Sequence, residues 1–176
     1  EPTDSVQLKK LFPQIIEHYG PVYIRLFRKN AWSIFGESDS FTLGNGCLLR
    51  QGSEVTLFAS GIMVKEALEA AEQLAGQGIS AEVINLHTIK PLDSELVLAS
   101  VTKTGCCVTA ENANIIGGLG SAVSECVSGG APCPVLRVGV EDRFGEVGKM
   151  DYLQKELHLT AANIVQKAKE AVALKR

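Results

Sequence analysis

The chain has 176 residues, enough for one domain that buries roughly 70% of the surface of its unfolded chain. Its hydrophobic content of 45%, charged content of 21% and net charge of -3 are those of an ordinary globular protein, and they exclude a basic nucleic-acid-binding domain. No apolar run is long enough to span a membrane and no signal peptide is recognisable. We therefore expect a cytoplasmic protein without a membrane partner.

Five cysteines have neither the spacing of metal ligands nor that of a C-x-x-C motif, and an odd number suits a reducing compartment. They are Cys47, Cys106, Cys107, Cys126 and Cys133. Cys106 and Cys107 lie in an apolar run, which predicts small core residues rather than reactive thiols.

The first helix is expected after Asp4 or Ser5, either of which can cap it, and before Gly20-Pro21, which stops it. Pro13 lies inside this span and should kink or shorten the helix, because proline removes a backbone donor and clashes with the preceding turn.

A strand is predicted over residues 22–28, with Arg25 and Arg28 of opposite parity and therefore on opposite faces. One helix and one strand cannot bury both of their faces. The segment is therefore expected to be the tail of a domain whose larger part is absent.

A linker is expected over residues 29–40, with Trp32, Ile34 and Phe35 packing back onto a domain surface. The Asn-Gly pair at positions 45 and 46 is typical of a hairpin turn, and it predicts a short antiparallel pair of strands, 41–43 and 47–50.

Beyond this point strands alternate with helices, which predicts parallel pairing, right-handed crossovers and helices on both faces of a sheet. The expected strands are 55–59, 81–86, 106–110 and 134–140, and the expected helices are 61–77, 93–101, 117–130, 150–157 and one capped by Thr160.

Gly117, Gly118 and Gly120 follow the central strand and open a helix. A dinucleotide fingerprint needs glycines at its first, third and sixth positions, and counted from Gly118 the sixth is Val123. The pattern therefore favours a structural role for these glycines and disfavours a nicotinamide-dependent dehydrogenase.

Several polar residues are expected at the edge where open sheets bind ligands. His87 and Lys90 follow one strand and Glu111 ends the next, and Ser60-Gly61 begins a helix that can hold an anion. Structural alternatives are a hydrogen-bonded loop histidine at position 87 and a helix-capping or interface carboxylate at position 111. A binding or regulatory module would use the same residues to hold a small anion.

Arg25 and Arg28 carry the planar donors that match a phosphate at two points. The alternative interpretation of these arginines is a solvated or interface ion pair.

Three linked motifs resemble transketolases, in order and in separation: Gly-Pro-Val-Tyr-Ile-Arg-Leu-Phe-Arg at 20–28, Thr-Ile-Lys-Pro-Leu-Asp at 88–93, and Glu111 with Gly-Gly-Leu-Gly-Ser-Ala-Val at 117–123. The second motif favours transketolase over deoxyxylulose phosphate synthase and the beta subunits of 2-oxo acid dehydrogenases, which remain alternatives.

The resemblance implies three parts: residues 1–30 as the last helix and strand of a truncated pyrimidine-binding domain, 31–40 as a linker, and 41–176 as a transketolase C-terminal domain. It implies a three-layer α/β/α sandwich around a mostly parallel five-stranded sheet with one antiparallel edge strand. The missing domains are expected in cis or as a separate subunit, and the complete protein is expected to be a homodimer.

The resemblance further implies that Arg28 contacts the phosphate of a sugar substrate, with Arg25 as the second candidate. The complete enzyme would use thiamine diphosphate and Mg²⁺, whose ligands in the family have no counterpart here, so the chain alone is expected to be inactive. Where many relatives carry a histidine after the central-strand Glu-Asn, this chain has Ala113.

Overall fold

Strands and helices alternate from residue 47 onward and build one five-stranded sheet in the computed structural model, which describes residues 1–29 and 31–175. The strand order is β1-β3-β2-β4-β5, with β1 antiparallel to β3 and the other pairs parallel. The elements are α1 (Ser5–Glu17), β1 (Cys47–Arg50), β2 (Val55–Ala59), α2 (Met63–Ala75), β3 (Ala81–Asn85), α3 (Ser94–Thr104), β4 (Cys107–Asn114), α4 (Leu119–Gly130), β5 (Val135–Val140), α5 (Met150–Glu156) and α6 (Ala161–Ala173). The expected α/β/α sandwich with one antiparallel edge strand is confirmed.

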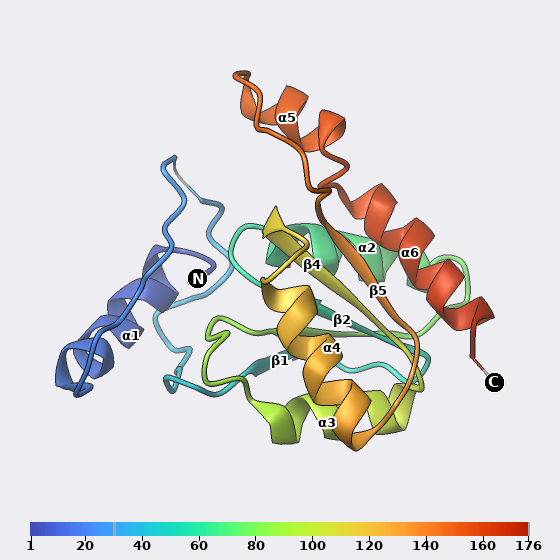
Figure 1. Ribbon diagram of the computed structural model, residues 1–176, viewed down its shortest axis with the longest axis horizontal. Coiled ribbons are helices and arrows are strands. Elements are labelled where there is room, and N and C mark those ends of the chain that lie inside the picture. Colours follow the sequence, from blue (N-terminus) through green and yellow to red (C-terminus); the bar gives the residue numbers. More distant parts are fainter. Residues whose placement is uncertain (30, 176) are drawn as a thin grey trace.

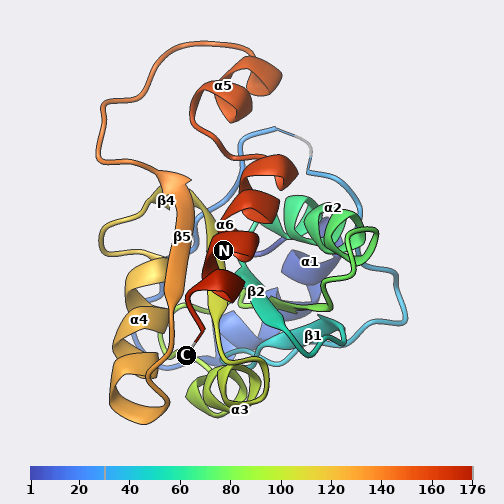
Figure 2. The same cartoon turned by 90° about the vertical axis from the view of Figure 1, so that its right-hand side faces the viewer.

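Helices cover both faces of the sheet, α2 and α6 on one face and α3 and α4 on the other (Figures 1 and 2). Along β2, Val55 and Leu57 join the core beneath α2 and α6, whereas Phe58 joins the core beneath α3 and α4. Because both faces of the central strands are covered, these strands consist of continuous apolar runs rather than alternating ones. Cys106 and Cys107 are buried core residues, as the sequence predicts.

Three predicted helix caps are present. The side chains of Asp4, Asp93 and Thr160 each accept a hydrogen bond from the backbone N–H three residues later. Of the two effects predicted for Pro13, shortening does not occur, because α1 continues past it to Glu17.

Helix α1 and the linker are attached to the sandwich by buried polar groups. The second oxygen of Asp4 accepts from the N–H groups of Ile34 and Phe35, both at 2.9 Å, and the Gln7 amide donates to the Asn85 side chain at 2.7 Å. Leu11, Phe35 and Phe41 form a small apolar cluster beneath these contacts. The expectation that Ile34 and Phe35 pack back onto a domain is therefore confirmed; Asn30 lies outside the described residues.

Two predicted strands are absent from the described part of the chain. Residues 22–28 are not a strand, because no neighbouring strand pairs with their backbone. Residues 41–43 are not a strand either, because Cys47–Arg50 pairs with β3 instead of forming the expected hairpin. The Asn45 N–H donates to the Thr42 carbonyl, so a turn does form before β1.

A buried carboxylate joins the end of β4 to the start of α4. Glu111 is 1% exposed, and its two oxygens accept from the N–H groups of Leu119 and Gly120, each at 2.8 Å. The negative charge meets the positive end of the helix dipole. A Cβ atom at Gly118 would lie 1.9 Å from Glu111 Oε2, so only glycine fits there. The capping interpretation of Glu111 is confirmed.

The junction predicts that alanine substitutions of two glycines at opposite ends of α4 change the free energy of unfolding in opposite directions. Replacing Gly118 by alanine should lower the free energy of unfolding by about 2 kcal/mol or more, because the new methyl group displaces the carboxylate from its donors. Replacing Gly129, where a Cβ meets nothing within 4 Å, should raise it by about 0.5–1 kcal/mol. Urea unfolding of both variants measures this, and equal effects would contradict the assignment.

Candidate functional site

The carboxyl ends of β2, β3 and β4 bring Ser60, His87 and Asn112 to one edge of the sheet. The chain proceeds from β2 to β3 on one side and returns to β4 on the other, so the crevice between the ends of β2 and β4 is a topological switch point. Open α/β sheets bind ligands at such crevices.

This crevice holds a carboxylate of the protein itself. The Glu1 side chain accepts from Ser60 Oγ at 3.3 Å and forms an ion pair with Arg25, and it lies against Gly61 at the start of α2. The predicted anion position at Ser60-Gly61 is therefore filled by Glu1. Arg25 also donates to the carbonyl of Asn112, so its guanidinium spans the ends of two strands.

A cavity of about 300 Å³ lies between residues 25–29, the end of β4 and helix α5. We call it the α5 cavity. Arg25, Arg28 and Lys29 bring three positive charges to its lining, and Met150, Leu153 and Leu157 contribute apolar surface from α5 and the residue after it. Helix α5 stands away from the sandwich (Figure 1) and has no buried residue. The combination suits a polar ligand with an anionic end.

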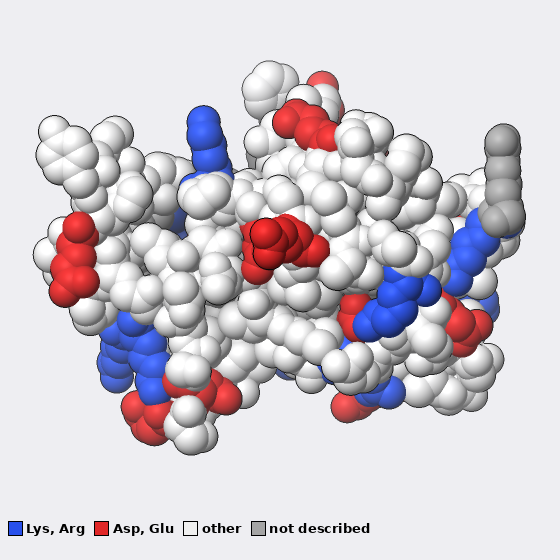
Figure 3. Space-filling model, turned by 90° about the horizontal axis from the view of Figure 1, so that it is seen from below, with Lys and Arg blue, Asp and Glu red and all other residues white. Residues whose placement is uncertain are grey.

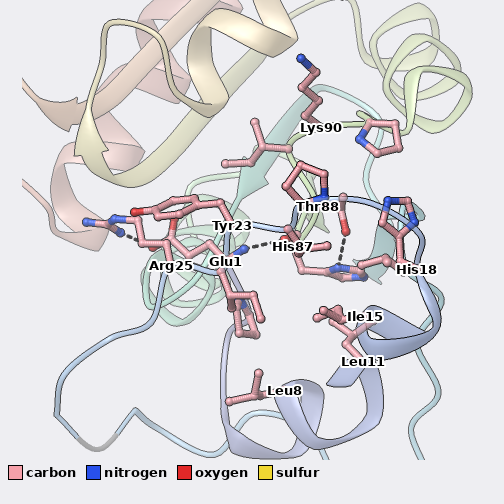
Figure 4. Close-up of a pocket in the computed structure, with 17 residues that line it drawn as sticks. Glu1, Leu8, Leu11, Ile15, His18, Tyr23, Arg25, His87, Thr88 and Lys90 are labelled. Atoms are coloured by element: carbon pink, nitrogen blue, oxygen red, sulfur yellow. Dashed lines mark hydrogen bonds and ion pairs between the residues drawn. The ribbon is translucent and has the colours of Figure 1, made fainter. Parts of the chain in front are cut away.

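A second cavity of about 530 Å³, the α1 cavity, lies between α1, residues 18–25 and the loop after β3. Figure 4 shows Leu8, Leu11 and Ile15 rising from α1 toward His87, with Arg25 and His18 on opposite sides and Lys90 extending outward. Its walls are mainly apolar. Arg25 lines both cavities, so the two cavities share this residue.

His87 is 3% exposed in the wall of the α1 cavity. Its Nδ1 atom lies 3.0 Å from the Thr88 hydroxyl, so the interpretation as a hydrogen-bonded loop histidine is confirmed. Among the described residues Nε2 is buried and has no hydrogen-bond partner. Burial, with a smaller contribution from the positive α-amino group nearby, lowers the pKa of His87 to about 4, so the ring is neutral at pH 7.

The structure brings Arg25 and Arg28 to one cavity rather than to opposite faces. The parity argument is wrong here because residues 22–28 do not form a strand. Arg25 also forms the ion pair that was the structural alternative for these arginines. Within the described chain no ion pair is found for Arg28 or Lys29, which both belong to the lining of the α5 cavity. The apolar contribution of α5 was not predicted, since only the folded chain brings it beside residue 28.

The described residues contain no cluster of His, Cys, Asp and Glu that could hold a metal ion. Glu111 accepts from the first N–H groups of α4, and the first N–H groups of α2, those of Met63 and Val64, donate to the carbonyls of Ser60 and Gly61, so neither helix offers these groups to a pyrophosphate. The chain's own residues therefore do not fit a diphosphate cofactor with its metal. No described helix is long and apolar enough to cross a membrane. On the face seen in Figure 3, Lys and Arg are interspersed with Asp and Glu, without a single basic patch.

His87 predicts a pH dependence of stability. The pKa is about 4 in the folded chain and 6.5 ordinarily, so the unfolded chain binds a proton first as the pH falls. The free energy of unfolding should therefore fall between pH 6.5 and 4, by up to about 3 kcal/mol from this residue. Urea unfolding of His87→Gln should lack this part of the pH dependence, whereas His158→Gln, at an exposed position, should retain it. Equal pH dependence in wild type and His87→Gln would refute the assignment.

Comparisons with known proteins agree with this architecture. One relative is a protein of Clostridium sp. (strain MSTE9) that is named as a subunit of a 6-deoxy-6-sulfo-D-fructose transketolase. It is 59% identical to this chain, and the match covers 99% of this chain and 54% of that protein. A putative transketolase C-terminal section from Methanocaldococcus jannaschii is 40% identical over 96% of the chain and 54% of its own length. A 1-deoxy-D-xylulose-5-phosphate synthase from Heliobacterium modesticaldum is 37% identical over 96% of the chain and 27% of its own length.

A solved structure described as a split-gene transketolase, inactive beta4 tetramer, superposes with a TM-score of 0.94 at 43% identity, over 99% of this chain and 57% of that chain. The chain thus spans about half the length of the first two curated relatives. Residues 44–164 match the family described as Transketolase, C-terminal domain. By this match and by its fold, the chain belongs to the transketolase family.

Proposed function

We propose that this chain is the C-terminal portion of a thiamine-diphosphate-dependent transketolase of the cytoplasm, which transfers a two-carbon ketol unit between sugar phosphates in the pentose phosphate pathway. The observation that carries the proposal is the α5 cavity, a space of about 300 Å³ whose lining includes Arg28, Lys29 and Arg25. The transketolase-named relatives support it.

Arg28 is the first proposed substrate contact, and Arg25 is the second candidate. A guanidinium binds two oxygens of a phosphate at once, so it fixes the orientation of the ligand as well as its charge. The phosphate lies at the end of the sugar remote from the reacting carbons. Arg28 would therefore contribute binding and orientation, not proton transfer.

The rest of the enzyme is the proposed partner of residues 1–30, the expected end of the pyrimidine-binding domain. Residues 31–40 are then the linker, and 41–176 the C-terminal domain. Phe12, Ile16, Tyr19, Val22, Tyr23 and Leu26 are large apolar side chains that this segment leaves exposed. Residues 22–28 belong to no described helix or strand, so a sheet in cis or in a separate subunit can add them as a strand. The complete enzyme is proposed to be a homodimer.

Thiamine diphosphate, with Mg²⁺, would supply the electron sink for ketol transfer when the missing domains bind it. The described residues of this chain do not fit that cofactor, so its site is assigned to those domains. This chain's own contribution is architecture, subunit contact and recognition of the anionic end of the sugar.

A sulfonated sugar is a second candidate substrate. The 59% identical relative is named for 6-deoxy-6-sulfo-D-fructose, and a sulfonate, like a phosphate, presents several oxygens to a guanidinium. Ketol transfer from this sugar and from xylulose 5-phosphate, compared with the same enzyme, separates the two candidates.

The first experiment measures ketol transfer from xylulose 5-phosphate to ribose 5-phosphate in the presence of thiamine diphosphate and Mg²⁺. The assay is made with this chain alone and with this chain mixed with a polypeptide that supplies the missing domains. We expect activity only in the mixture, because the described residues of the chain offer no ligands for the cofactor and its metal. Calorimetric titration of the chain alone should show no stoichiometric binding of thiamine diphosphate. Binding by the chain alone, or an inactive mixture whose components associate, would overturn the proposal.

Replacing Arg28 by methionine should raise KM for the anionic sugar about 10- to 100-fold and leave kcat within about threefold, because a lost charge-assisted hydrogen bond is worth about 1.5–3 kcal/mol. Arg50→Met on edge strand β1, outside both cavities, is the matched control and should leave KM within about twofold. Steady-state kinetics of the active mixture decides, and an unchanged KM in Arg28→Met would remove this residue from the substrate site.

A further inference from the structure

The carboxylate of Glu111 lies beside an irregular stretch of β4. Pairing with β5 is regular as far as Ala110 opposite Val138, and it resumes at Asn114 opposite Val140. Between these two pairs, β4 has three residues, 111–113, where β5 has only Gly139. Residues 111–113 therefore bulge out of the ladder. We call this stretch the β4 bulge.

The β4 bulge is held at both ends. Glu111 fixes its first residue to α4 through the N–H groups of Leu119 and Gly120. Beyond its other end, the Ile115 N–H donates to the Val140 carbonyl and the Arg137 guanidinium donates to the Ile115 carbonyl, each at 3.0 Å. The conformation between these anchors is therefore fixed by hydrogen bonds that lie outside the regular ladder.

The bulge directs the Asn112 carbonyl to Arg25. This carbonyl accepts from Arg25 Nη2, and the opposite nitrogen of the same guanidinium pairs with Glu1. Arg25 lines both cavities, so the position of the Asn112 carbonyl determines where the positive charge between them lies. Glu111 is one residue from Asn112 but is buried and touches neither cavity.

We infer that Glu111 is a positioning residue of the anion site: by holding the β4 bulge against α4, it places the Asn112 carbonyl that orients the Arg25 guanidinium. This inference rests on the proposed function for its kinetic consequence. Its structural content, the dependence of Arg25 on Glu111, stands independently.

A matched carboxylate separates positioning from general stability. Glu66 on α2 is also buried and accepts from the Ala161 N–H at the start of α6, at 2.8 Å, so it caps a helix as Glu111 does. It lines neither cavity. Glu111→Gln and Glu66→Gln each exchange one oxygen of a buried helix-capping carboxylate for an NH₂ group that cannot accept; Glu111 accepts two N–H groups and Glu66 accepts one.

In the active mixture, Glu111→Gln should raise KM for the anionic sugar about tenfold and leave kcat within about twofold, whereas Glu66→Gln should change neither beyond twofold. Added to Arg25→Met, Glu111→Gln should raise KM no further, because both changes act through the same guanidinium. A further tenfold rise in the Arg25→Met background, or an equal rise in Glu66→Gln, overturns the inference. If Glu111→Gln does not fold, Glu111→Asp is compared in its place.

A second readout needs no activity. In the ¹⁵N spectrum of the 176-residue chain, the Arg25 Nε–H signal, assigned with Arg25→Lys, should shift in Glu111→Gln and stay in place in Glu66→Gln. An unmoved signal in Glu111→Gln also overturns the inference. If the wild-type mixture transfers no ketol unit, the proposed function fails and this spectrum still decides the role of Glu111.

Discussion

A desolvated carboxylate fixes the junction between β4 and α4, and the edge of the sheet that faces both cavities depends on this junction. Burial raises the pKa of Glu111, while the N–H groups of Gly120 and Leu119 oppose that shift. Hydrogen bonds to a charged group are worth about 1.5–3 kcal/mol each, so two of them offset a large part of the cost of removing a carboxylate from water. Gly118 contributes by what it lacks, because a side chain there would occupy the volume of the carboxylate.

The switch-point crevice of this sheet is occupied by the Glu1 side chain. In many open α/β proteins the crevice between such strand ends receives a ligand. Here Glu1 lies at the start of α2, and Arg25 links Glu1 to the Asn112 carbonyl near the end of β4. The crevice therefore serves as the joint between residues 1–29 and the sandwich, and the open cavities lie on either side of that joint.

Most of the sandwich could be predicted from the sequence because its elements are local patterns. Buried strands consist of apolar runs, and Asp4, Asp93 and Thr160 mark helix starts by their own chemistry. Residues 22–28 have the composition of a strand, but a strand also needs a neighbour, and the described chain supplies none. The hairpin prediction failed for a related reason, since β1 gains more backbone pairing from β3 than residues 41–43 can offer.

The candidate site was only partly predictable, because it is made by contacts across the whole chain. Arg25 and Arg28 stand out as residue types that bind anions, yet their shared cavity depends on α5, more than 120 residues later. Glu111 stands out as a carboxylate at a strand end, but its partners are backbone N–H groups. Because almost every residue has such a group, the residue types in the sequence do not identify these partners.

The two parts of the chain differ in how completely they bury their apolar surface. Helices cover both faces of the sheet, so the sandwich has two closed cores. Residues 1–29 instead leave Ile16, Tyr19 and Tyr23 largely exposed and have only one small shared cluster. A closed core holds its geometry without further partners, whereas an open apolar face gains stability when another surface covers it. The joint at Arg25 thus connects a sandwich with two closed cores to a segment whose large apolar side chains are exposed, and the α5 cavity lies where the two meet.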